Sequence, residues 1–230
     1  MAGIVVLHED RELLAVAKPP GRIVIPGRTA GERSLREELE AVHGRLWVVH
    51  RLDRGTSGVL LFARTAEAHR ALNLAFDEGT PEKRYLALVR GTPPESVRVD
   101  LALAKGRKGR VRPARPGEVG AKPSATRFRR LETWGAAALG GPFAWVEALP
   151  ETGRTHQIRV HLASLGTALS LDPDYGEAGP LRRADGSVWL DRTPLHAERL
   201  VVRHPVDGTA LELSAPLPED LELALEMLRG

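Results

Sequence analysis

The 230-residue sequence contains no cysteine, and this absence removes several chemistries at once. Disulfides, thiolate zinc sites, iron–sulfur clusters and cysteine nucleophiles are all excluded. No stretch approaches the roughly eighteen consecutive apolar residues of a membrane span. No basic leader precedes the short apolar run Ile4 to Leu7, so no export signal is visible. We therefore expect a globular protein of the cytoplasm.

The remaining composition is that of a folded domain, since 42% of the residues are hydrophobic and can bury a sizeable core. Apolar runs predict strands at residues 4–7, 13–17, 23–25, 46–49, 59–63, 84–89 and 144–149. Helical spacing and capping patterns predict helices at residues 34–43, 66–78 and 156–165 and after Pro218. Residues 92–124 are rich in proline, glycine and arginine and predict strands joined by long surface loops. Without an internal repeat, the sequence favours one α+β domain over residues 1–230.

Basic residues are clustered, although the formal net charge is only +3. Of the 33 basic residues 28 are arginine, and the densest run is interleaved with glycine and proline. That composition suits an extended arm over RNA phosphates, but it also suits a solvated loop. The run consists of Lys105, Arg107, Lys108, Arg110, Arg112 and Arg115.

A polar loop with a central carboxylate is predicted between two apolar strands, in residues 50–58. Asp53 lies beside Arg54 and two residues from Arg51, and this positive charge favours an anionic carboxylate that can attack carbon. Gly55 and Gly58 permit backbone geometry that side chains would forbid. The alternative is a structural ion pair in a turn, which the residues alone do not exclude.

A second polar stretch, residues 152–161, places cationic and amide groups at the start of a predicted helix. Arg154, His156 and Gln157 can hold a phosphate or ribose at the helix N-terminus. Arg159 lies off the apolar stripe of this helix and can pair with a carboxylate. Helix capping and a surface charge are the alternatives, and spacing does not decide between them.

These stretches resemble the RluA-type family of RNA pseudouridine synthases. His50-Arg51-Leu52-Asp53 with Thr56-Ser57-Gly58 is similar to the nucleophile motif of that family, residues 83–91 to its tyrosine strand, and residues 152–161 to its third motif. Weaker similarity occurs, in the family's order, at residues 18–21, 172–176, 195–197 and 215–218. The resemblance thus covers nearly the whole chain.

The resemblance implies a fold, a reaction and three catalytic residues. The fold would be a mixed, mostly antiparallel sheet with flanking helices and loops around a central RNA-binding cleft. Asp53 would attack ribose C1′ or assist loss of the uracil, Tyr85 would stack on the base and act in proton transfer, and Arg159 would orient Asp53. Isomerisation needs no redox step, so neither a metal nor an organic cofactor is expected.

The resemblance also implies RNA as the partner, either ribosomal or transfer RNA, with the target uridine extruded from its stack. A monomer is the default. RNA selection is expected to use the catalytic domain, because the family's catalytic-domain pattern begins within the first few residues of the sequence. Leu171 stands where the family usually has glycine, and this is a departure from the family's pattern at that turn. The residues expected to contact RNA are His50, Arg51, Arg54, Thr56, Lys105, Arg107, Lys108, Arg110, Arg154, His156 and Gln157.

Three other functions compete with this interpretation. A metal-dependent hydrolase is suggested by the eight histidines, but no His-Glu-x-x-His or comparable spacing occurs. A glycoside hydrolase usually needs two matched carboxylates, and only Asp53 lies in a convincing motif. An inactive RNA-binding or ribosome-assembly factor would be expected to have lost at least one of Asp53, Tyr85 and Arg159, and all three are present.

Overall fold

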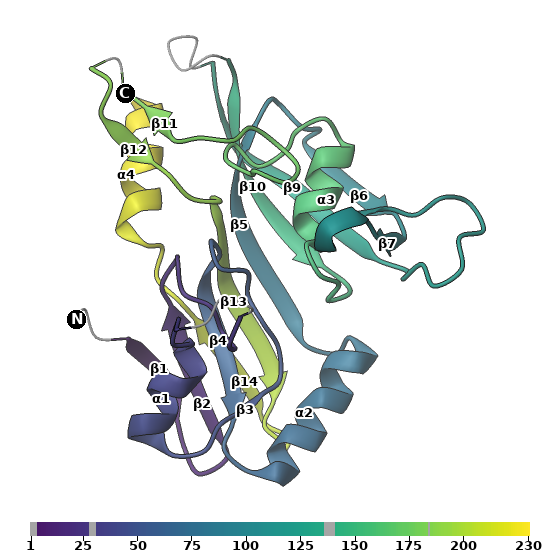
Figure 1. Cartoon of the computed structure of the whole chain (residues 1–230), viewed down its shortest axis with the longest axis vertical. Coiled ribbons are helices and arrows are strands. Elements are labelled where there is room, and N and C mark those ends of the chain that lie inside the picture. The colour runs from purple at the N-terminus through teal and green to yellow at the C-terminus, as the bar shows by residue number, and fades with distance from the viewer. Residues whose placement is uncertain (1–3, 28–30, 136–140, 184) are drawn as a thin grey trace. The chain divides into compact units, whose positions relative to one another are not determined.

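The computed structural model describes residues 4–27, 31–135, 141–183 and 185–230. The chain divides into two compact units, and its elements are labelled in Figure 1. The first unit comprises Met1–Lys83 and His196–Leu217, and the second comprises Arg84–Leu195 and Pro218–Gly230. The assignment of the chain to a single domain stays a prediction.

The first unit is built on a mixed sheet in which β1, β2, β4 and β13 are neighbours in that order. Strand β2 pairs antiparallel with β4, whereas β13 pairs parallel with β4. The short β3 also pairs with β4, and β14 pairs with β13. The strands are β1 (Val5–Glu9), β2 (Leu13–Lys18), β3 (Trp47–Val48), β4 (Ser57–Ala63), β13 (Leu195–Arg203) and β14 (Ala210–Ser214).

Two capped helices accompany this sheet, and both were predicted. Helix α1 (Leu35–His43) begins at a capping box in which Ser34 and Glu37 bond to each other's backbone N–H. Helix α2 (Ala66–Glu78) begins at Thr65 and ends at Gly79 in the left-handed conformation. These contacts span three or four residues, and this local character made them visible in the sequence.

The second unit contains an antiparallel sheet in the order β5, β10, β9, β6. Two small hairpins, β7–β8 and β11–β12, complete its strands. Helix α3 (Gln157–Ser164) contacts β8, β9 and β10, and helix α4 (Glu219–Arg229) contacts β12 (Figure 1). The strands are β5 (Glu82–Arg90), β6 (Ser96–Asp100), β7 (Leu103–Lys105), β8 (Val111–Pro113), β9 (Ala125–Trp134), β10 (Phe143–Pro150), β11 (Leu181–Arg182) and β12 (Val188–Leu190).

Each unit has its own hydrophobic cluster. In the first unit, buried residues of β2, β4, β13 and β14 pack against α2 residues such as Leu72. In the second unit, residues of β5, β9 and β10 pack against Ile158 and Leu162 of α3. Strand β4 is buried along its whole length, as expected for a central strand covered on both faces. The α+β class with a mixed, mostly antiparallel pattern is confirmed.

Some local predictions were wrong or incomplete. Residues 23–25 form an irregular segment with a bend, not a strand, although backbone N–H groups of α1 donate to Ile23 and Val24. Strands β9, β13 and β14 were not predicted as strands. Arg159 was placed outside the apolar stripe of its helix, yet it is buried, because β-structure and the segment after α3 surround that helix on more than one side.

Candidate active site

The predicted nucleophile loop lies in the first unit between β3 and β4. Asp53 is half-buried, and its backbone carbonyl accepts a hydrogen bond from the Thr56 N–H at 3.1 Å. The loop therefore makes a tight turn directly after Asp53 and enters the buried strand β4 at Ser57. A reacting group on such a loop has a rigid base.

A buried lysine holds this turn from inside the unit. Lys18, at the end of β2, is 1% exposed, and its Nζ donates to the carbonyls of Pro19, Arg54 and Thr56 at 3.0, 3.2 and 2.7 Å. Three carbonyl acceptors match the three protons of an ammonium group and offset the cost of its burial. Lys18 thus connects β2 to Arg54 and Thr56, two of the three residues that follow Asp53 in the turn. The sequence offered no sign of this role beyond the similarity of residues 18–21 to a family motif.

The glycine that ends the loop allows two strands to approach closely. Gly58 has φ of +119°, and a Cβ at this position would lie 2.1 Å from the Ala197 carbonyl oxygen of β13. The predicted need for glycine at this position is confirmed. Beside it, buried Ser57 and His196 join their side chains across β4 and β13, with Oγ and Nδ1 2.9 Å apart. This contact and the Gly58 approach hold β4 and β13 in register.

His50 also lies inside this framework. Its Nε2 accepts a hydrogen bond from the Leu61 N–H at 3.0 Å, and its ring stacks on Phe76 with 5.0 Å between centroids. Burial of the ring, with the charge of Lys83 as a smaller cause, lowers the pKa of His50 to about 4. The neutral ring therefore anchors the start of the loop. An RNA contact by His50 stays a prediction.

The other predicted RNA-binding residues of this loop differ in exposure. Arg51 and Arg54 are exposed, and Arg54 pairs with Glu32. Thr56, by contrast, is 2% exposed, and its Oγ1 is a buried atom with no hydrogen-bond partner among the described residues. The two arginines are placed where RNA can reach them, whereas the Thr56 side chain is not.

Arg159, in the second unit, belongs to a buried ion-pair cluster. Its Nε and Nη2 donate to the two oxygens of Asp172, both at 2.7 Å, and Nη2 also donates to Asp174 at 2.9 Å. Its guanidinium lies over the Tyr175 ring, 5.0 Å from the centroid. Burial raises the pKa of Asp174, but bonding to Arg159 and the charges of Arg159 and Arg110 outweigh it, and the net shift is downward. We call Arg159, Asp172, Asp174 and Tyr175 the Arg159 cluster.

Asp172 and Asp174 come from the segment after α3 in which the resemblance was weak. Leu171, in place of the family's usual glycine, is buried in the core at 5% exposure. The turn that follows is closed by the Gly176 N–H, which donates to the Asp172 carbonyl at 2.8 Å. The leucine is therefore accommodated, and the turn still presents Asp172 to Arg159. The sequence interpretation had not assigned these two aspartates a role.

The start of α3 combines strain with inward hydrogen bonds. His156 has φ of +54°, the one positive value among described non-glycine residues, and its Nδ1 lies 2.8 Å from the Tyr175 hydroxyl. The Gln157 amide donates to Ala125 and Thr126 and accepts from Thr152 and the Arg154 N–H. The side-chain polar atoms of Gln157 are thus occupied by contacts within the second unit, while Arg154 is exposed. Their contacts with RNA stay predictions.

Tyr85 lies on β5, half-buried, opposite Ala148 of β10. It packs against the hydrophobic cluster of the second unit. Next to it, Arg84 donates to Glu147, and hydrogen bonds from Arg129 and then Arg84 lower the pKa of that carboxyl against the effect of its burial. One side of Tyr85 is therefore supported by the core, as a ring that stacks on a base would need. Asp53 belongs to the first unit and Tyr85 and Arg159 to the second, so their joint action stays a prediction.

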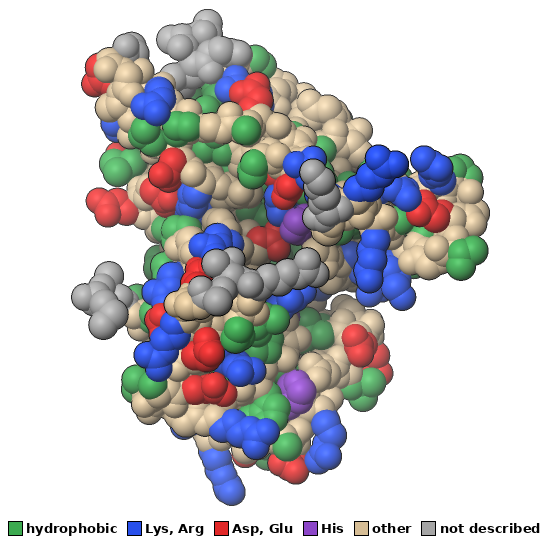
Figure 2. Space-filling view, viewed as in Figure 1, with side chains coloured by type: hydrophobic (Ala, Val, Ile, Leu, Met, Phe, Trp, Pro, Cys, Tyr) green, Lys and Arg blue, Asp and Glu red, His purple; other side chains and the backbone are tan. Residues whose placement is uncertain are grey.

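The predicted basic arm is a hairpin. Strands β7 and β8 pair antiparallel around a 3₁₀ turn, η1 (Arg107–Gly109), and β8 contacts α3. Figure 2 shows Lys and Arg side chains gathered at the right of the view, over this hairpin and the loop after it. Lys105, Arg107 and Arg110 are exposed, and the Lys108 side chain lies outside the described part of the structure. The extended arm expected from composition is thus a folded element.

Two arginines of this hairpin have carboxylate partners. Arg110 Nε donates to Asp174 at 3.0 Å, which connects the hairpin to the Arg159 cluster. Arg112 binds Glu118 through both Nη atoms, at 2.8 and 2.6 Å. These bonds, with one from the Arg115 N–H, lower the pKa of Glu118 to about 2. Among described residues, no ion pair involves Lys105 or Arg107, so no carboxylate there neutralises these two cations, and their contact with RNA phosphates stays a prediction.

Within the described residues, no group of three His, Asp or Glu side chains is placed to hold a metal ion. In that part of the chain, no helix combines the length and apolar character needed to cross a membrane. The expectation that the reaction uses no cofactor stays a prediction.

Comparison with known proteins matches these features to one family. The model of the RNA pseudouridylate synthase family matches residues 12–164, which include Asp53, Tyr85 and Arg159. An uncharacterized RNA pseudouridine synthase of Mycobacterium bovis is 37% identical, with 99% of this chain and 74% of the relative covered. Ribosomal large subunit pseudouridine synthase C of Escherichia coli K12 is 38% identical, with 98% and 70% covered.

Solved structures agree with the sequence comparisons. Human RNA pseudouridylate synthase domain containing 4 superimposes with a TM-score of 0.74 at 25% identity, covering 98% of this chain and 93% of that one. Human RNA pseudouridylate synthase domain containing 1 gives 0.73 at 27% identity, covering 99% and 95%. The chain belongs to the RNA pseudouridylate synthase family and is an RNA-modifying isomerase.

Proposed function

We propose that this enzyme isomerises uridine in ribosomal RNA, with Asp53 as the catalytic nucleophile. The observation that carries the proposal is the Asp53 loop, which Lys18, Gly58 and His50 hold rigidly at the end of two strands within the matched region. The RNA class rests on relatives named as ribosomal large subunit pseudouridine synthases. Transfer RNA is the second candidate substrate, from the same family resemblance.

The reaction rearranges one nucleotide without adding or removing atoms overall. The bond between ribose C1′ and uracil N1 breaks, the uracil turns, and C1′ bonds to C5. The proton on C5 is then lost, and N1 gains one. Asp53 attacks C1′ or assists departure of the uracil, and its carboxylate is released when the new carbon–carbon bond forms.

Tyr85 and Arg159 complete the proposed catalytic set. Tyr85 is supported by the cluster behind β5, so its ring can stack on the uracil at small entropic cost while its hydroxyl takes part in proton transfer. Arg159 is held by Asp172 and Asp174, which keep its guanidinium in a defined orientation. We assign it the task of orienting Asp53 during the reaction.

The target uridine must leave its stack before its C1′ can be reached. The exposed Arg51 and Arg54 flank Asp53 in sequence and are suited to hold the RNA backbone or to fill the vacated position. We therefore propose base flipping as the step that precedes chemistry. A cytoplasmic location and a monomeric state stay predictions from the sequence.

RNA containing 5-fluorouridine provides the direct test of Asp53. The enzyme is expected to form a tight or covalent adduct with it, and Asp53→Ala is expected to form none. Asp77→Ala removes an exposed carboxylate of α2 in the same unit and serves as the matched control, with an undiminished adduct. Normal uridine isomerisation by Asp53→Asn would refute the assignment, and release of free uracil would favour a hydrolase.

The RNA class is tested by mapping pseudouridine across total RNA from cells with and without the gene. Loss of a signal at a position in large-subunit ribosomal RNA is the expected result. Loss only in transfer RNA would refute the ribosomal assignment and leave the enzyme class intact. If neither RNA changes and the purified protein is inactive on both, the inactive assembly-factor alternative would be favoured.

A further inference from the structure

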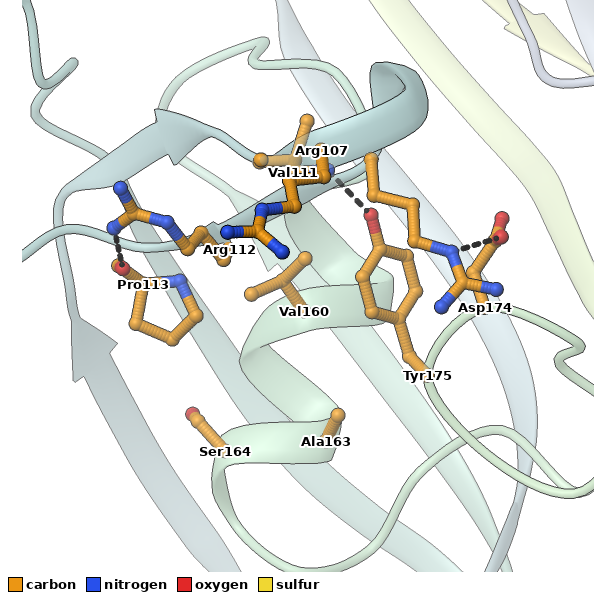
Figure 3. Close-up of a pocket in the computed structure, with 11 residues that line it drawn as sticks. Arg107, Val111, Arg112, Pro113, Val160, Ala163, Ser164, Asp174 and Tyr175 are labelled. Carbon is orange, nitrogen blue, oxygen red and sulfur yellow. Dashed lines mark hydrogen bonds and ion pairs between the residues drawn. The ribbon is translucent and has the colours of Figure 1, made fainter.

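A pocket of about 440 Å³ lies wholly within the second unit, between the β7–β8 hairpin, helix α3 and residues 174–175 (Figure 3). Its volume is within the range of small-molecule sites, roughly 300–1,000 Å³. None of the three proposed catalytic residues lines it. We call this space the hairpin pocket.

The walls of the hairpin pocket are mainly apolar and include one aromatic ring. Val160 and Ala163 of α3 form one wall, Val111 and Pro113 of β8 form another, and the Tyr175 ring closes the side next to Asp174 (Figure 3). An apolar slot beside an aromatic face favours a flat ring system that can stack. Such walls contribute little to binding an extended or fully polar ligand.

Cations surround this apolar space. Arg107, Arg110 and Arg112 line the pocket, and Lys105 lies at the end of the adjoining strand. Residues 103–118 contain six basic residues and one acidic residue, Glu118, so the segment carries a net charge of +5. Arg110 and Arg112 have carboxylate partners. Arg107 and Lys105 are therefore the cations that we expect to contact a ligand. A ligand that fits both parts of the site has a flat ring joined to an anionic backbone.

The pocket is held open by specific hydrogen bonds. The Tyr175 hydroxyl accepts from the Val111 N–H at 2.9 Å, which fixes the ring against the hairpin. Arg110 bonds to Asp174 at 3.0 Å and attaches the hairpin at a second point. A site already formed before binding loses less free energy in ordering its ligand contacts.

We propose that the hairpin pocket binds a single-stranded nucleotide of the RNA substrate other than the target uridine. Its base lies between α3 and β8 beside Tyr175, and its phosphates meet Arg107 and Lys105. This inference rests on the proposed RNA substrate and adds a second anchoring point outside the catalytic residues. Each base held in this way contributes through stacking, and the cations contribute through release of counterions.

Binding of a short RNA without uridine tests this proposal apart from catalysis. Heptacytidylate is compared with a heptamer of the same phosphate backbone made of stable abasic ribose, using the Asp53→Asn protein and fluorescence anisotropy. The cytidine heptamer is expected to bind about tenfold more tightly, because only it offers a base for the pocket. Equal affinities would overturn the proposal.

Filling the pocket gives the matched variant. Ala163→Leu places a larger side chain in the wall and is expected to abolish the difference between the two heptamers. Ala71→Leu makes the same change at an exposed position of α2 and is expected to preserve it. Unchanged discrimination in folded Ala163→Leu protein, checked by circular dichroism, would overturn the proposal.

Two further readouts locate the ligand and identify its source. Photo-crosslinking with a central 5-iodocytidine is expected to label the segment 157–164 or Tyr175, and labelling only elsewhere would contradict the site. Free cytidine monophosphate is expected to compete only weakly, and competition equal to that of the heptamer would identify a mononucleotide site instead.

On the mapped full RNA, Ala163→Leu is expected to raise KM and leave kcat unchanged. Each of these results can fail while Asp53-dependent isomerisation persists.

Discussion

The Asp53 loop and the Arg159 cluster present two proposed catalytic residues by different physical means. The loop is held through main-chain groups, by the Lys18 ammonium on three carbonyls, the His50 ring on a backbone N–H and the close approach at Gly58. The Arg159 cluster is held through side-chain charges, in a bidentate pair with Asp172 and a further bond to Asp174. The first arrangement depends on shape and hydrogen-bond count, and the second depends on paired charge.

This difference suits the two tasks. A residue that attacks carbon must be placed accurately, and contacts to the main chain fix the loop that carries Asp53. A guanidinium that orients a carboxylate must itself be oriented, and bidentate pairing supplies direction. Four substitutions test this contrast, in order of decreasing expected effect.

Gly58→Ala tests the close approach of β4 and β13 beside the Asp53 loop. The new Cβ would lie 2.1 Å from the Ala197 carbonyl oxygen, so β4 and β13 must separate. We expect a loss of more than about 4 kcal/mol in the free energy of unfolding, or failure to fold. Gly44→Ala is the control, since Gly44 also has positive φ, +77°, with ψ of −165°, but open space around it, and backbone strain alone costs about 1–3 kcal/mol. Urea denaturation measures both, and equal losses would mean that β13 yields easily.

Asp172→Asn tests the paired charges of the Arg159 cluster. It leaves the buried Arg159 guanidinium without its bidentate carboxylate, and breaking a buried pair costs about 3–5 kcal/mol. The control, Asp100→Asn, removes a carboxylate that pairs with Arg98 but is 69% exposed, where we expect less than about 0.5 kcal/mol. A small loss for Asp172→Asn in urea denaturation would show that Asp174 alone holds the guanidinium.

Lys18→Met tests whether the hydrogen bonds from Lys18 to main-chain carbonyls matter for the reaction as well as for stability. The variant keeps the length of the side chain but removes the donor shared by three carbonyls, of which that of Arg54 still accepts from the Gly21 N–H, and we expect a cost of about 1–3 kcal/mol. We expect kcat to fall more than KM rises, because the turn after Asp53 loosens. Lys122→Met, at an exposed position, is expected to change neither quantity. Full activity in Lys18→Met would show that the Lys18 hydrogen bonds contribute to folding alone.

His50 makes the first region sensitive to acid. Its folded pKa of about 4 lies below the ordinary value of 6.5, so the unfolded chain binds more protons between these two values. The stability that His50 contributes is therefore complete above about pH 6.5 and is lost as pH falls toward 4, by about 2–3 kcal/mol. His50→Gln keeps an acceptor for the Leu61 N–H without a titrating ring. Urea denaturation from pH 7 to 4.5 is expected to show a shallower decline in this variant, and identical slopes would contradict the assignment.

The elements most visible in the sequence are those that depend on near neighbours. The Ser34–Glu37 capping box and the Thr65 and Gly79 helix ends involve residues at most four apart, and their predictions were confirmed. Strand β9 was not predicted, although Phe128 lies between exposed neighbours, because arginines at positions 127, 129 and 130 interrupt its apolar residues. Residues 23–25, which form an irregular segment with a bend, were predicted as a strand because a short apolar run does not show whether a pairing partner exists.

The residues of the candidate site show the same division between sequence motifs and contacts that are distant along the chain. Asp53, Tyr85 and Arg159 were selected through ordered motifs, which survive in the sequence independently of geometry. The partners of Lys18 lie up to 38 residues away, and Asp172 lies 13 residues beyond Arg159, so neither contact leaves a local pattern. His50 and Gln157 were expected at an RNA surface, and the structure shows both with inward hydrogen bonds.

The sequence by itself determined the family, the order of the motifs and the position of the helix caps, because each of these is encoded in residue identities and short spacings. Only the tertiary structure decided which of the many cations and polar groups are structural and which face solvent. The physical reason is that the role of a charge depends on its burial and its partners. Those partners are brought to Lys18 and Arg159 by strands and turns that are distant along the chain.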